Sequence, residues 1–219
     1  MQGFFMEHAQ TSLRGRAAAG QDPDKRNQIL DGARRCFLRV GFEASSMNEI
    51  TAEAGVSKGT IYVYFQNKEE LFIELIKRER AALIGLAEHE LNEGQPIADT
   101  LKRFGMAFAT KMSSDDVVRA QRIVLGVAER LPEVAESFFG PEPFSGVVIL
   151  KTYLDAQVDA GALVIPDTEL AARQFIELST AATFKSRLFG HLKTPMPHER
   201  LSAVVDSAVA MFLKFYKPE

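Results

Sequence analysis

Several features that would indicate an enzyme or a secreted protein are missing from this 219-residue chain. It has a single cysteine, Cys36, which excludes an internal disulfide and fits a reducing cytoplasm. The four histidines, His8, His89, His191 and His198, are scattered and form no helical pair of metal ligands. The sequence also lacks a glycine-rich phosphate loop, a serine in a nucleophile elbow and a histidine close to the cysteine. We therefore expect no enzymatic activity, no metal site and no cofactor.

Long apolar runs are also absent, and so is the alternation of apolar and polar residues that marks a surface strand. No run is long enough to span a bilayer, and the apolar residues 3–6 are interrupted by Glu7 and His8 before they could form a signal-peptide core. Only residues 162–165 resemble a short strand. We expect an all-α protein in the cytoplasm, with no membrane partner.

Neither sign of charge is in large excess. The formal net charge is −3. Up to Arg80 the chain has 12 Lys and Arg against 11 Asp and Glu, and after Arg80 it has 14 against 18. This asymmetry has the sign expected of a nucleic-acid-binding N-terminal part, but it is small. The functional argument therefore depends on local sequence signals.

What the chain does contain is a series of helix signals between residues 46 and 72. Ser46 stands three residues before Glu49, a capping box that begins a helix, and Gly55 can end that helix because it adopts positive φ without strain. Ser57 is a suitable N-cap for a second short helix, and a third begins after Asn67. Two short helices joined by a tight turn and followed by a third predict a helix-turn-helix.

The second of these helices has residue types suited to DNA. Ile61 and Phe65 lie four apart and can anchor it to its own domain, which leaves the other side chains facing outward. The predicted DNA contacts are Ser46, Ser57, Lys58, Gly59, Thr60, Tyr62, Val63, Tyr64 and Lys68. Within this set we expect Thr60 at a base edge and Val63 at a thymine methyl, while the glycine admits a close approach. The two serines, the second tyrosine and Lys68 are expected at phosphates.

This stretch resembles a known signature. Residues 55–65, GVSKGTIYVYF, followed by NKEELF at 67–72, resemble the DNA-binding signature of the TetR family of transcriptional regulators. The amphipathic helix that the family places upstream is present at 29–37. Thr51, where alanine is usual, and Val63, where histidine or another aromatic is frequent, depart from the pattern. These departures leave open which operator is read.

The resemblance also implies a division of the chain. We expect an N-terminal three-helix helix-turn-helix domain at 22–67 and a larger helical domain for ligand binding and dimerisation at 68–219. Residues 1–21 show no periodicity and would form a flexible arm. Arg14 and Arg16 of this arm could enter a DNA minor groove, or they could be solvated residues of a disordered tail.

A second resemblance covers the rest of the chain. VRAQRIV at 118–124, ERLPEV at 129–134 and LAARQF at 170–175 are similar to the C-terminal domain of AefR-like regulators. The resemblance implies dimerisation through the last two long helices and an inducer held between helices. Helical periodicity predicts helices over residues 68–92, 97–112, 115–130, 132–139, 143–160, 168–189 and 198–216.

Two apolar stripes in this region support a homodimer. The predicted interface residues are Phe175, Leu178, Ala182, Leu201, Val204, Val205, Ala208, Met211 and Phe212. The alternative is that the stripes face only the core of their own subunit, and both can hold in part.

Aromatic residues and methionines in the same region suit an adaptable apolar pocket. The predicted pocket residues are Phe104, Phe108, Met112, Arg119, Arg122, Phe138 and Phe175. One of Arg119, Gln121 and Arg122 would point inward and fix a polar group of the ligand. The alternatives are ordinary core packing for the apolar residues and solvent exposure for the arginines.

These expectations combine into a homodimeric repressor on a pseudo-palindromic operator of double-stranded DNA. A small hydrophobic or amphipathic ligand would favour a subunit spacing that no longer fits both half-sites, with the helix after Lys68 as the lever. The competing hypothesis is a helical protein-interaction module that retains a helix-turn-helix but has no ligand response.

Overall fold

The computed structural model describes residues 20–91, 94–139 and 146–218, without the side chains of 80, 82–89, 135 and 137–139. Every regular element in these ranges is a helix, which confirms the all-α prediction. The helices are α1 (Pro23–Ala44), α2 (Met47–Ala54), α3 (Lys58–Tyr64), α4 (Lys68–Glu90), α5 (Ile97–Met112), α6 (Asp115–Val127), α7 (Pro132–Phe139), α8 (Gly146–Asp159), α9 (Thr168–Thr180), α10 (Phe184–Leu188) and α11 (His198–Tyr216).

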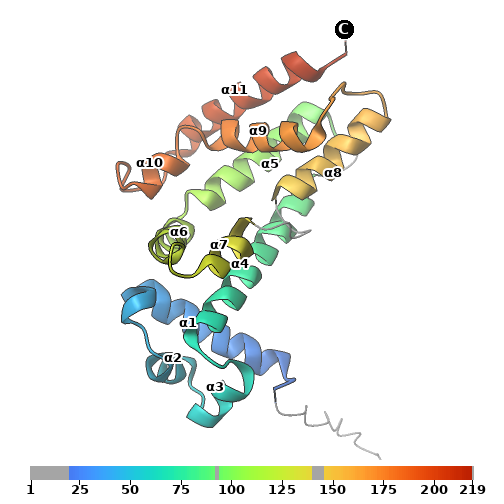
Figure 1. Cartoon of the computed structure of the whole chain (residues 1–219). Coiled ribbons are helices and arrows are strands. Elements are labelled where there is room, and N and C mark those ends of the chain that lie inside the picture. Colours follow the sequence, from blue (N-terminus) through green and yellow to red (C-terminus); the bar gives the residue numbers. More distant parts are fainter. Residues whose placement is uncertain (1–19, 92–93, 140–145, 219) are drawn as a thin grey trace, which may run out of the picture.

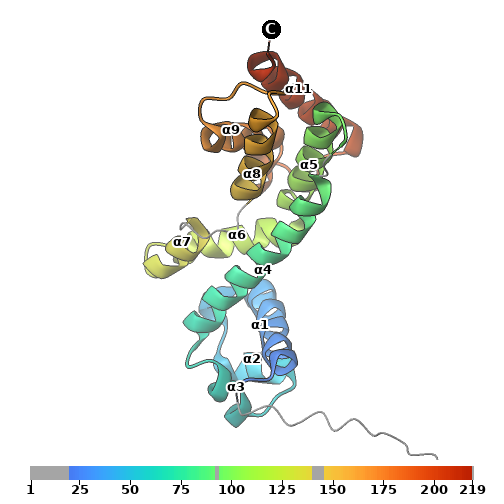
Figure 2. The same ribbon diagram turned by 90° about the vertical axis from the view of Figure 1, so that its right-hand side faces the viewer.

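The molecule is elongated, with α1 to α3 at one end and α8, α9 and α11 at the other (Figures 1 and 2). The long helix α4 runs from the first group towards the second. None of the helices in the described ranges is long and apolar enough to cross a membrane.

The ends of the first helices follow the local sequence closely. Asp22 caps α1 by accepting hydrogen bonds from the amides of Asp24 and Lys25. Ser46 caps α2 by accepting from the Glu49 amide at 3.2 Å, as the capping box predicts. The Glu49 carboxylate accepts from the Ser46 hydroxyl at 2.9 Å, whereas in a regular capping box it accepts from the backbone amide of the cap residue.

Close packing of α1 on α2 depends on a glycine. A Cβ built on Gly32 would lie 2.5 Å from Ala54 Cβ and 2.6 Å from the Ala54 Cα and N atoms. Because backbone atoms of α2 occupy that space, only a residue without a side chain lets the two helices approach this closely.

The core of the N-terminal domain extends beyond residues 22–67. Its aromatic centre is formed by Phe37, Phe42 and Phe72, whose ring centroids lie 5.0–5.6 Å apart. Val124 of α6 and Val134 of α7 are buried in the same cluster. The corner between α6 and α7 therefore completes the core beneath the helix-turn-helix.

A second core lies between α5, α8, α9 and α11. Phe104, Leu154, Phe175 and Phe212 are buried in it. Gly105 of α5 allows a close approach here, since a Cβ at this position would lie 2.8 Å from a methyl group of the Val205 side chain.

The prediction of one helix over 168–189 is wrong, because α9 ends at Thr180 and α10 begins at Phe184. The hydroxyl of Ser179 donates to the Phe175 carbonyl at 2.8 Å, and the hydroxyl of Thr180 donates to the Ile176 carbonyl at 3.0 Å. Thr183 follows with a bond to the Thr180 carbonyl at 3.2 Å. Hydroxyls that bond back to helix carbonyls bend helices, and three of them lie at this break.

We predict opposite effects of alanine at two helical glycines. Gly32→Ala should lower the free energy of unfolding by about 1–3 kcal/mol, because its Cβ meets the backbone of α2. Gly126→Ala in α6 is the matched control, since nothing in the described structure lies within 4 Å of its Cβ. It should raise stability by about 0.5 kcal/mol through helix propensity. Equal effects of the two changes in urea unfolding would contradict the close approach of α1 and α2.

Candidate nucleic-acid interface

The helix α3 lies at the end of the molecule farthest from α11 (Figures 1 and 2). Its buried side and its capped start hold it in place. Ile61 is fully buried and Phe65 is 2% exposed. Tyr62 and Val63 between them are 46% and 52% exposed. The helix therefore presents one row of side chains to solvent, as the spacing of its apolar residues predicts.

The start of α3 is prepared to meet an anion or a polar base edge. Ser57 Oγ accepts a hydrogen bond from the Thr60 amide at 3.0 Å, and the two hydroxyl oxygens lie 2.7 Å apart. Lys58 is exposed beside them, and the first turn of α3 carries no acidic residue. A helix N-terminus has a partial positive charge and unpaired amides, and Lys58 adds to this charge.

Gly59 lies in an open part of the described surface. Among the described residues, a Cβ at this position would meet only the Ser57 hydroxyl, 3.9 Å away. Glycine in a helix costs about 0.5–1 kcal/mol relative to alanine. No contact within the described residues therefore requires a glycine here, and Gly59 leaves the exposed face of α3 open to the close approach of a partner.

Lys68 lies differently from its expected place at a phosphate. Its ammonium donates to the carbonyls of Phe42 at 3.0 Å, Ser45 at 3.2 Å and Glu43 at 3.4 Å. It also lies 4.5 Å from the centre of the Phe42 ring. All three donors of the ammonium are directed at the end of α1, where a positive charge is favourable. This geometry ties the start of α4 to the link between α1 and α2.

Two other predicted contacts, Ser46 and Tyr64, already have partners within the protein. Tyr64 is half-buried and packs against the N-terminal core. The hydroxyl of Ser46 donates to the Glu49 carboxylate, so a negative charge lies beside it. Thr51, which departs from the family signature, is engaged within its own helix, because its hydroxyl donates to the Met47 carbonyl at 2.6 Å. Tyr64 and Ser46 are thus less free than Lys58 and Tyr62.

Sequence reasoning missed one feature of this surface. Gly20 has a φ of 88°, and a Cβ built on it would lie 3.3 Å from both Cγ1 and the carbonyl oxygen of Val63. The chain therefore enters α1 alongside α3. Residues 1–19, with the predicted role of Arg14 and Arg16, lie outside the described residues. A glycine just before an Asp-Pro helix start was the only sequence signal for this contact.

The predicted pocket residues do not all come together. Phe104 and Phe175 are buried side by side, with ring centroids 6.3 Å apart, and Phe108 stacks on Phe104. Met112 is half-buried at the end of α5, and the side chain of Phe138 lies outside the described residues.

Neither arginine of the three predicted candidates points into this aromatic cluster, and the third candidate, Gln121, is half-buried. Arg119 is exposed and donates to the Leu38 carbonyl of α1 at 3.2 Å. Arg122 donates to the carbonyls of Leu188 at 2.8 Å and Arg187 at 2.7 Å. Periodicity places these residues on the polar side of α6 but gives no sign of their partners.

The predicted dimer residues divide into two groups. Those buried in the core of their own subunit are Phe175, Leu201, Val205, Ala208 and Phe212. Those half-buried or exposed are Leu178, Ala182, Val204 and Met211. Phe215, which continues the same apolar stripe beyond the named interface residues, is 79% exposed, and Met211 is 50% exposed one helical turn before it. The core reading therefore holds for the first group, and an interface role of the second group stays a prediction.

Comparisons with known proteins agree with this geometry. Residues 29–75 match the model of bacterial regulatory proteins of the tetR family, and residues 99–218 match the C-terminal domain of AefR-like transcriptional repressors. An HTH-type transcriptional repressor of Mycobacterium tuberculosis is 35% identical over 66 residues, which are 30% of this chain and only 35% of that protein's length.

Solved structures show the same architecture over nearly the whole chain. A TetR-family transcriptional regulator from Mesorhizobium loti has a TM-score of 0.83 at 21% identity and covers 89% of this chain and 98% of its own, a likeness of fold alone. The flavonoid-responsive regulator FrrA has a TM-score of 0.73 at 28% identity and covers 90% of this chain and all of its own.

We predict that Lys68 contributes to stability and that Lys58 does not. Lys68→Ala should lower the free energy of unfolding by about 2 kcal/mol, because three carbonyls at the end of α1 lose a charged donor. Lys58→Ala, at an exposed position, should change it by less than about 0.5 kcal/mol. Thermal and urea unfolding measure both changes. If Lys68→Ala left stability unchanged, the ammonium would be free to contact a phosphate as the sequence suggested.

Proposed function

This chain belongs to the TetR family of bacterial transcriptional regulators, and we propose that it is a repressor that binds its operator as a homodimer and is released by a small ligand. Its family consists of regulators, so the chain is a DNA-binding regulator and not an enzyme. The observation that supports the proposed site best is the exposed face of α3, with a capped N-terminus and a glycine that no contact among the described residues requires.

In this proposal α3 lies in the major groove. Lys58, Thr60, Tyr62 and Val63 face the bases, and Gly59 lets the helix backbone approach them closely. The Ser57 hydroxyl caps the helix, and it also lies within hydrogen-bonding distance of the Thr60 hydroxyl and can therefore orient that side chain. Ser46 and Tyr64 hold phosphates at the edge of the site, while Lys68 fixes the helices that carry them.

The exposed face of α11 supports a homodimer. Met211 and Phe215 are exposed on successive turns, with Ser207 and Ala203 on the turns before them. Small residues allow a partner helix to come close, and the two large apolar residues would be covered by it. Ala182 at the end of α9 is exposed as well. The proposed interface therefore uses the exposed residues of α11, while its buried residues pack the core of their own subunit.

For the ligand we propose a small hydrophobic or amphipathic molecule bound in the domain formed by α5, α8, α9 and α11. Support comes from the aromatic content of this region, with Phe104 stacked on Phe108. A structural neighbour at 28% identity is described as flavonoid-responsive. An aromatic compound of this kind is a reasonable first candidate. The alternative is a helix-turn-helix protein that acts through protein contacts and has no ligand response.

Operator binding tests the function directly. We expect the purified dimer to bind selectively to DNA from upstream of its own gene. Its affinity for this DNA should fall steeply as the salt concentration rises. One member of a panel of hydrophobic and phenolic compounds should release the protein from the DNA. Gly59→Ala should weaken binding by about tenfold or more, because its Cβ obstructs the close approach, while the protein becomes no less stable. Fluorescence anisotropy at two salt concentrations measures both.

Three outcomes of this experiment would count against parts of the proposal. Unaltered binding by Gly59→Ala would remove the close approach of α3. Binding that no compound releases would sink the ligand response, and no selective binding at all would favour the interaction module.

The dimer interface is tested by adding a charge. Met211→Glu should weaken self-association by about a hundredfold or more, since an unpaired carboxylate would be buried between the subunits. Leu125→Glu is the matched control, because Leu125 is a similarly exposed apolar residue on α6, at 58%. Sedimentation velocity should show monomers for the first variant and dimers for the second. A dimeric Met211→Glu protein would place the interface elsewhere.

A further inference from the structure

We propose that the start of α1 holds the recognition helix α3 at both ends and thereby determines how sharply α3 distinguishes base pairs. Arg26 is the positioning residue for the C-terminal end of α3, and Gln28 is the positioning residue for the turn that leads into it. This inference rests on the proposed function, since it requires that α3 reads bases in the major groove.

Arg26 joins the end of α3 to α4. Its guanidinium lies over the Phe65 ring, 5.3 Å from the ring centre, and pairs with the Glu74 carboxylate of α4. Lys77 also pairs with Glu74, at 3.0 Å, so the carboxylate is held from two sides. Phe65 ends α3, because its backbone is extended and its amide donates to the Ile61 carbonyl at 2.9 Å. A cation is attracted to an aromatic ring beneath it, and Arg26 thus fixes the residue at which α3 stops.

Gln28 joins α1 to the turn between α2 and α3. Its side-chain nitrogen donates to the Ala54 carbonyl at 2.8 Å, and its side-chain oxygen accepts from the Lys25 ammonium at 2.8 Å. The lysine therefore orients the amide so that its nitrogen faces the turn. Gly55 lies against the same amide, since a Cβ built on it would be 3.8 Å from the Gln28 nitrogen. Because Ala54 is the last residue of α2, this contact fixes the point from which the chain leads into α3.

Neighbouring residues of α1 can reach both ends of α3 because side chains two positions apart point to different sides of a helix. The recognition helix has only seven residues, and Ile61 in its middle is fully buried. Restraints at its ends therefore decide how it is oriented about this buried residue. The chain before α1 adds a contact near the end that Arg26 holds, since a Cβ built on Gly20 would lie 3.3 Å from a methyl group of Val63.

Orientation of α3 affects discrimination between bases more than it affects total affinity. A hydrogen bond to a base edge or a contact with a thymine methyl needs side chains placed to within about 0.5 Å. Thr60 lies near the start of α3 and Val63 near its end. If one anchor is removed, the end of the helix nearest to it is displaced most, and the side chain there loses its preference for one base.

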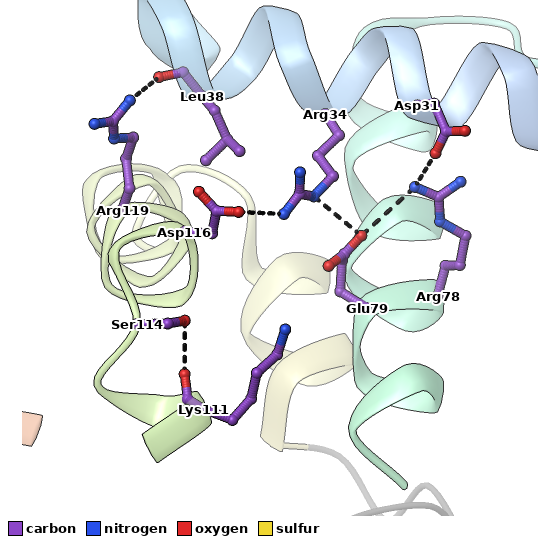
Figure 3. A network of polar contacts seen from close by, with 9 residues as sticks. All are labelled: Asp31, Arg34, Leu38, Arg78, Glu79, Lys111, Ser114, Asp116 and Arg119. Atoms are coloured by element: carbon purple, nitrogen blue, oxygen red, sulfur yellow. Dashed lines mark hydrogen bonds and ion pairs between the residues drawn. The ribbon is translucent and has the colours of Figure 1, made fainter. Parts of the chain in front are cut away.

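Other ion pairs between α1 and α4 supply a matched control. Arg78 of α4 pairs with Asp31 of α1 at 2.8 Å, and its partners among the described residues lie on α1 and α4. Figure 3 shows this pair beside Arg34, which contacts Glu79 at 3.4 Å and Asp116 of α6 at 2.8 Å. Arg78→Ala therefore removes an arginine between the same two helices and leaves both anchors of α3 in place.

The test measures discrimination at single base pairs, as the ratio of affinities for the native operator and for its single-base variants. Thr60→Ala and Val63→Ala first identify the operator positions that each side chain reads. Arg26→Ala should lower the ratio about fivefold at the Val63 positions and less than about twofold at the Thr60 positions. Gln28→Ala should show the reverse pattern, and Arg78→Ala should change neither ratio by more than about twofold.

A second readout needs no DNA. Amide hydrogen exchange, followed by NMR on the whole protein, compares the Phe65 amide at the end of α3 with the Val56 amide in the turn before it. Exchange at Phe65 should quicken about tenfold in Arg26→Ala, and exchange at Val56 about tenfold in Gln28→Ala. Glu74→Gln removes the charge that holds the arginine and keeps the size of the side chain. It should quicken exchange at Phe65 in the same direction, also if Arg26→Ala does not fold.

Equal loss of affinity for every sequence in Arg26→Ala, with unchanged exchange at Phe65 in that variant and in Glu74→Gln, would overturn the inference. The same holds if Arg78→Ala lowered the ratios as much as Arg26→Ala does. If the wild-type protein bound no operator, the proposed function would fail, and amide exchange alone would decide whether the start of α1 holds α3.

Discussion

The arrangement of the whole chain depends on one apolar core that is built from segments far apart in sequence. Phe37 and Phe42 from α1 and Phe72 from α4 form its aromatic centre, and Val127 of α6 and Val134 of α7 close it. A small three-helix unit buries limited apolar surface by itself. The α6–α7 corner supplies additional surface, so the part that carries α3 is stabilised by helices that lie far beyond it in the sequence.

This dependence explains how so short a recognition helix is kept in place. A helix of seven residues is marginal in water, because the cost of nucleation exceeds what a few hydrogen bonds return. Ile61 and Phe65 fix α3 to the shared core, and Ser57 satisfies an amide at its start. Lys68 adds a third restraint, since it ties α4 to the end of α1. The exposed side chains of α3, such as Tyr62 and Val63, can therefore vary in sequence without loss of the fold, which suits a surface that selects DNA.

The sequence was sufficient wherever one short segment decides the structure. The caps at Ser46 and Ser57, the turn at Gly55 and the buried pair Ile61 and Phe65 all follow from spacing within a few residues. The break after Thr180 was missed, although the hydroxyls that cause it are visible, because alanines around it favour a helix. Periodicity also could not separate the buried residues of the α11 stripe from the exposed ones, since a core and an interface use the same apolar residue types.

Long-range polar contacts were beyond reach for a physical reason. An arginine has a long side chain with five donors, and its partner is fixed only when the backbone brings a carbonyl or carboxylate near. Arg119 and Arg122 lie close together on one helix, yet the first reaches α1 and the second reaches α10. Nothing in their local sequence distinguishes the two directions.

The contacts on α6 also bear on how a ligand would act in the proposed mechanism. A ligand shifts a conformational equilibrium only by its difference in affinity for the two states, commonly about 1–3 kcal/mol. A domain held to the rest of the chain only by strong apolar contacts would resist such a shift. Here the valines of α6 keep the domain attached, while Asp116 and Arg119 supply weak, directional contacts at its rim. Because the apolar attachment is strong and the polar contacts are weak, the DNA-binding domain can change its angle to the rest of the chain without coming off it. Such a change alters how well the two α3 helices of a dimer fit two half-sites at a fixed spacing. In the proposed mechanism α4 would therefore not act alone, because α6 is attached to the same domain.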